Sequence, residues 1–88
     1  MISNFSKSDV QNVSDFLQDY LKRHQINVLT ADECAELLAE NGILSNKVGP
    51  QPGFNFRQML RDGRDGLIPM VKGASQERPN TRWSICRI

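Results

Sequence analysis

The sequence predicts a single α+β domain, residues 1–88, in which three helices pack on a small antiparallel sheet. Apolar residues recur at a 3–4 spacing in two N-terminal segments and again after a proline-rich connector, which is typical of helices buried on one side. Polar and apolar residues alternate near the C-terminus, which indicates a strand. The chain has 88 residues, of which 39% are hydrophobic, so it can build one modest core but not two.

The first helix is expected over residues 8–24, with Ser6 or Ser8 as the N-cap. Tyr20 and His24 lie one turn apart on it, and we interpret them as a packed tyrosine beside a solvated imidazole rather than as a catalytic pair. Residues 26–29 follow as a short β-prone segment, which needs a strand from elsewhere in the chain.

The second helix is expected over residues 30–41. Thr30 followed by Glu33 is the pattern of a capping box, and Gly42 marks the C-terminal end. Cys34 lies in the apolar stripe of this helix, so we predict a packing role for it rather than a nucleophilic one.

The third helix is expected over about residues 55–62, after a connector that contains Pro50 and Pro52. Asn55 and Gln58 fit a capping box, Phe54 and Met59 fit a hydrophobic staple, and Gly63 fits the left-handed residue after the helix. The spacing predicts one buried stripe and one cationic stripe on this helix. The buried stripe comprises Phe56, Met59, Leu60 and Gly63, and the cationic stripe comprises Arg57, Arg61 and Arg64.

A C-terminal hairpin completes the prediction. Residues 67–71 are expected to form its first strand, with Pro69 restricting that strand to an edge, and residues 81–86 its second. Residues 72–80 would form a long tip between them. Thr81, Trp83 and Ile85 alternate onto one face, where Trp83 is expected to anchor the core.

Charge is distributed unevenly along the chain, although the net charge is only +1. Residues 1–44 contain three basic and seven acidic residues, a net charge of −4, whereas residues 45–88 contain eight basic and three acidic residues, a net charge of +5. Such asymmetry favours a basic face that meets a polyanion, and it is equally consistent with two copies that associate head to tail.

The order of helix, short strand, helix, connector, helix, strand, basic tip and strand resembles the winged-helix form of the helix-turn-helix domain. Helix 30–41 would correspond to the supporting helix, helix 55–62 to the recognition helix, and residues 72–82 to the wing. Residues 26–29 would be the small third strand beside the hairpin. No motif points to a subfamily.

The resemblance implies binding to duplex DNA, as in a small transcription regulator. Arg57, Arg61 and Gln58 would contact bases in the major groove. The residues that would contact phosphates are Lys47, Arg64, Lys72, Arg78 and Arg82.

Two other classes of function are considered beside this one. The same fold can serve as a protein-interaction module or as a homodimerising accessory protein without DNA binding. An enzyme is not expected, because the sequence has no catalytic triad, phosphate loop or carboxylate cluster.

No cofactor is expected, and Cys34, Cys86 and His24 are too few and too irregularly spaced for a zinc site. The two cysteines are expected to remain thiols in a cytoplasmic protein, since no signal-peptide pattern or membrane-spanning run appears.

Overall fold

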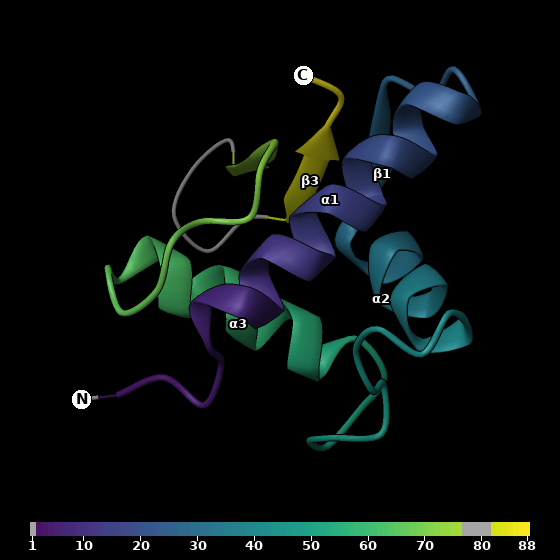
Figure 1. Ribbon diagram of the computed structural model, residues 1–88. Coiled ribbons are helices and arrows are strands. Elements are labelled where there is room, and N and C mark those ends of the chain that lie inside the picture. The colour runs from purple at the N-terminus through teal and green to yellow at the C-terminus, as the bar shows by residue number, and fades with distance from the viewer. Residues whose placement is uncertain (1, 77–81) are drawn as a thin grey trace.

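Three helices and a three-stranded antiparallel sheet form the domain in the computed structural model, which describes residues 2–76 and 82–88 (Figure 1). The helices are α1 (Lys7–Arg23), α2 (Ala31–Glu40) and α3 (Phe54–Arg64). The strands are β1 (Val28–Thr30), β2 (Ala74–Gln76) and β3 (Trp83–Cys86), and they lie in the order β1-β3-β2. The predicted α+β class is therefore confirmed.

The first two helices begin where their sequence signals place them. Ser6 caps α1: its hydroxyl oxygen accepts from Asp9 N–H, and the Asp9 carboxylate accepts from Ser6 N–H. Thr30 and Glu33 form the predicted capping box at the start of α2, which satisfies two backbone donors that would otherwise lack partners. Ile43 N–H then bonds Leu38 O beyond the end of α2, where Gly42 is left-handed.

The start of α3 differs from the prediction. Its N-cap is Gly53, not Asn55, and no side chain caps the helix. The amide of Asn55 instead donates to Ser45 O at 3.0 Å, so the expected capping box with Gln58 and the staple of Phe54 with Met59 are wrong. The physical reason is tertiary: Gly53 N–H donates to Asn46 Oδ1 at 2.5 Å, which anchors the helix start to the connector.

The end of α3 is also later than expected. Gly63 lies inside the helix, and Gly66, at φ +81°, takes the left-handed conformation after it. Gly63 has little room for a side chain, because a Cβ there would lie 3.0 Å from Met70 Sδ.

The first strand of the hairpin was predicted in the wrong place. Residues 67–71 are irregular, whereas β2 comprises Ala74–Gln76, inside the segment predicted as the tip. Pro69 offers no N–H for a ladder, and residues 67–71 are used instead to place Ile68 and Val71 against the core. The rest of the predicted tip, residues 77–80, and Thr81 lie outside the described residues.

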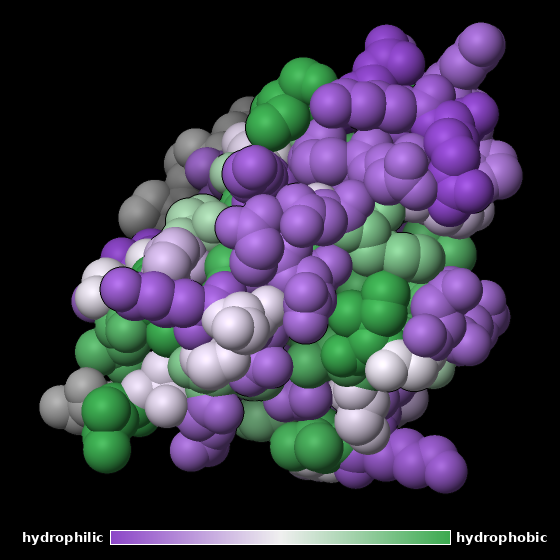
Figure 2. All heavy atoms as spheres, viewed as in Figure 1, coloured by the Kyte–Doolittle hydropathy of each residue, from purple (hydrophilic) through white to green (hydrophobic). Residues whose placement is uncertain are grey.

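The core lies between the helices and the sheet. Phe56, Met59 and Leu60 of α3 are buried, as their spacing predicted, and Trp83 and Ile85 point inward from β3. The α2 helix contacts α3, β1 and β3. Figure 2 shows mostly hydrophilic side chains over the outer side of α1, so this helix has the one-sided character that its sequence indicates.

Candidate nucleic-acid interface

One flank of α3, roughly a third of a turn from its buried stripe, carries the predicted arginine stripe. Arg57, Arg61 and Arg64 lie at i, i+4 and i+7, with Arg64 exposed and the other two partly buried. Because Phe56, Met59 and Leu60 fix the buried side of α3 in the core, the arginine stripe has a defined orientation relative to the rest of the domain.

Neutral groups hold the Arg61 side chain. Its Nη2 donates to Gln58 Oε1 at 2.9 Å, and the guanidinium lies 5.3 Å from the centre of the Phe54 ring. Neither partner carries a charge, so these contacts order the guanidinium without offsetting its positive charge.

Gln58 links Arg61 to a buried carboxylate. Its Nε2 donates to Asp62 Oδ1 at 2.8 Å, and Asp62 Oδ2 accepts a bond from Ser3 Oγ at 2.6 Å. Asp62 is buried on α3 beneath the N-terminal segment. Both the nitrogen and the oxygen of the Gln58 amide are thus hydrogen-bonded within the domain, and the oxygen holds the Arg61 guanidinium in place.

Arg57 is bound differently, because it forms an ion pair with Asp32 of α2. Its second terminal nitrogen donates to Pro52 O at 3.3 Å. Asp32 belongs to the acidic N-terminal half of the chain, so the charges of the two halves meet at this pair. The positive charge of Arg57 is therefore locally offset, whereas no carboxylate within residues 2–76 and 82–88 forms an ion pair with Arg61.

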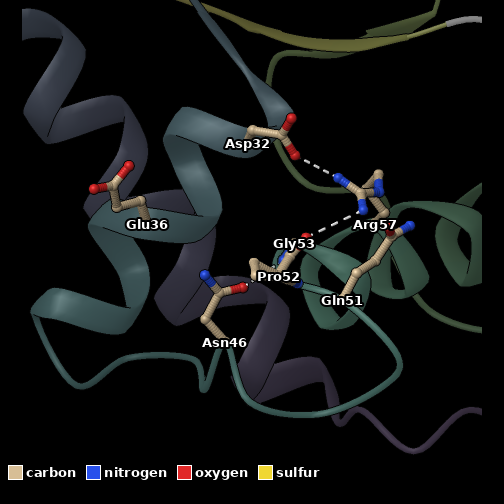
Figure 3. Close-up of a pocket in the computed structure, with 7 residues that line it drawn as sticks. All are labelled: Asp32, Glu36, Asn46, Gln51, Pro52, Gly53 and Arg57. Carbon is tan, nitrogen blue, oxygen red and sulfur yellow. Dashed lines mark hydrogen bonds and ion pairs between the residues drawn. The ribbon is translucent and has the colours of Figure 1, made fainter.

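A hollow of about 610 Å³ lies between α2, the connector and α3 beside this pair (Figure 3). Figure 3 shows Asp32 and Arg57 pointing toward each other, while Glu36 points away from them. The residues that line the hollow are Asp32, Glu36, Asn46, Gln51, Pro52, Gly53 and Arg57.

The structure separates the residues predicted to contact phosphates. Arg64 lies on α3, where its Nε is 3.4 Å from Asp65 Oδ1, and Lys47 and Arg82 are exposed on the connector and at the start of β3. Lys72 lines a different hollow together with Asp15 and Asp19 of α1. Lys72 is thus placed beside two aspartates of α1, and Arg78 lies outside the described residues.

Three residues of this surface did not figure among the sequence-based candidates: Asp32, Phe54 and Asp62. The spacing of Phe54 and Arg61 at i and i+7 is a signal that could have paired them, because both then lie on one side of the helix. In the sequence, Asp32 is recognisable only as an acidic residue in the first turn of a helix. Its ion pair could not be predicted from spacing, because Arg57 is 25 residues away in sequence.

Comparison of the chain with protein family models, with curated proteins and with solved structures gives no match. Within residues 2–76 and 82–88, no helix has the length and apolar character needed to cross a membrane. In the same part of the chain, no group of three or more His, Cys, Asp or Glu side chains is arranged to hold a metal ion.

Proposed function

We propose that this domain is a winged helix that binds duplex DNA through the arginine stripe of α3. The order of its elements and the strand order β1-β3-β2 are compatible with that fold. Under this proposal α2 is the supporting helix, α3 enters the major groove, and residues 72–82, of which 77–81 lie outside the described residues, are the wing.

One observation carries the proposal: neutral partners order the Arg61 guanidinium on α3, and none of the carboxylates that the structure describes forms an ion pair with it. An arginine held in this way loses little side-chain entropy on binding, and it can donate two bonds to guanine or one to a phosphate. Arg64, three residues later on the same stripe, is exposed, and because its pair with Asp65 is long at 3.4 Å we assign Arg64 to a DNA phosphate.

The experiment is fluorescence anisotropy with a generic 20-base-pair duplex at several salt concentrations. We expect Arg61→Ala to weaken binding by about 1–3 kcal/mol and to make the salt dependence shallower. The wild-type affinity itself should fall steeply as salt rises, because each phosphate contact releases a counterion.

Arg23→Ala is the matched control. Arg23 is an exposed arginine paired with Asp19 at 2.8 Å, and it lies at the end of α1 remote from α3 (Figure 1). This variant should bind as the wild type does. Equal effects of the two substitutions, or no binding by the wild type, would contradict the proposal, and a stable dimer that covers α3 would favour a protein-interaction role instead.

A further inference from the structure

The Arg57–Asp32 pair joins the starts of α2 and α3. Arg57 Nη1 donates to Asp32 Oδ1, and Nη2 donates to the carbonyl of Pro52, so the guanidinium is fixed at two points. The Arg57 side chain is 24% exposed, whereas that of Asp32 is 78% exposed. Any polyanion that approaches Arg57 therefore also meets the carboxylate of Asp32.

Gly53 makes room for this pair. A Cβ on Gly53 would lie 2.6 Å from Arg57 Nη1 and 2.9 Å from Asp32 Oδ1, closer than real Cβ atoms come to such groups. Gly53 also has φ +87°, a conformation that strains other residues. Gly53, the N-cap residue of α3, thus leaves free the space that the Arg57–Asp32 ion pair occupies.

The pairing changes what Arg57 can do at a DNA surface. A guanidinium that is paired with a carboxylate attracts a phosphate less strongly than a free one, so it contributes less to counterion release. Its remaining N–H groups can still donate to neutral acceptors, and the major-groove edge of guanine offers two such acceptors.

We propose that Asp32 is a specificity-determining residue, which withholds Arg57 from phosphates and directs it toward base edges. The inference rests on the proposed DNA-binding function and extends it. Asp32 itself acts through Arg57 and is therefore a positioning residue.

The test compares Asp32→Asn with Glu36→Gln, which removes one negative charge from the same hollow without touching Arg57. A binding site is first selected from a randomised duplex pool with the wild-type protein. Dissociation constants are then measured for that site and for the generic duplex across a salt series, and circular dichroism verifies the fold of each variant.

We expect Asp32→Asn to bind the generic duplex about two- to fivefold more tightly than Glu36→Gln does, because an exposed pair is weak and Arg57 becomes available to a phosphate. Its plot of log affinity against log salt should be steeper by about 0.9, the slope of one further phosphate contact. Its preference for the selected site over the generic duplex should fall.

Arg57→Gln removes the positive partner of the same ion pair. It should lower the preference for the selected site while leaving the salt slope unchanged, whereas Arg61→Ala should make the slope shallower.

Equal behaviour of Asp32→Asn and Glu36→Gln would overturn the role of Asp32 alone, provided that Arg61→Ala still weakens binding. A pool that yields no enriched site would also overturn it. Absence of binding by both the wild type and Asp32→Asn would overturn the DNA-binding proposal together with this one.

Discussion

At the scale of single residues, the buried polar side chains of the described part of the chain all have partners. Ser14 Oγ accepts from Lys72 N–H, and Asp62 accepts from Ser3 and Gln58. Cys34 differs from these side chains, because it is a free thiol buried among the apolar side chains of the core. Burial is the main reason that the pKa of Cys34 rises from 9.0 to about 12, and the negative charge of Glu33 adds to it.

This shift makes stability depend on pH in the alkaline range. Between pH 9 and about 12 the unfolded chain loses the Cys34 proton while the folded chain keeps it, so the free energy of unfolding should fall as pH rises through that window. Cys34→Ala removes the titration, and the wild type should lose about 1 kcal/mol per pH unit more than this variant. Urea titrations at pH 8, 9.5 and 10.5 measure the difference, and parallel pH dependences would refute the expectation.

At the scale of elements, hydrogen bonds from Gln18 connect α1 to the backbone at both ends of the C-terminal hairpin. Gln18 Nε2 donates to Lys72 O at 3.1 Å and to Cys86 O at 2.9 Å, while its Oε1 accepts from Ile88 N–H at 3.1 Å. Gly73 lies directly beneath this amide, and a Cβ there would collide with the Cys86 carbonyl. The base of the hairpin is therefore positioned by α1.

Removing the Gln18 amide should leave three backbone groups with fewer partners. We expect Gln18→Ala to lower the free energy of unfolding by about 1–3 kcal/mol, because three partly buried hydrogen bonds are lost. Gln11→Ala serves as the control, because Gln11 lies on the same helix with an exposed bond to Asp15. Chemical denaturation followed by circular dichroism compares them, and an equal effect of the two substitutions would show that the Gln18 bonds contribute nothing measurable.

At the scale of the whole molecule, the acidic and basic halves of the chain fold against each other rather than into separate lobes. Asp32 and Arg57 connect the halves at the surface, and the sheet connects them inside, because β3 of the basic half pairs with β1 of the acidic half. Trp83 is only 8% exposed, so the single tryptophan belongs to the core, as the sequence predicted.

Loss of this ring should affect the whole domain. Trp83→Ala is expected to cost about 3–5 kcal/mol, which is a large part of the stability of a small domain. Trp83→Phe should cost less, because it keeps an aromatic side chain in the core. Thermal unfolding followed by circular dichroism tests both, and a wild-type transition in Trp83→Ala would contradict the placement.

The sequence by itself determined the features that depend on neighbours a few residues apart. The apolar stripes of α1, α2 and α3, the caps at Ser6 and Thr30, and the inward alternation of Trp83 and Ile85 all follow from local spacing. Only the tertiary structure decided that Gly53 begins α3, that β2 lies at residues 74–76, and that Arg57 pairs with Asp32. The position of β2 is set by its pairing with β3, and Arg57 finds a partner 25 residues away in sequence, so the spacing of neighbouring residues indicates neither of them.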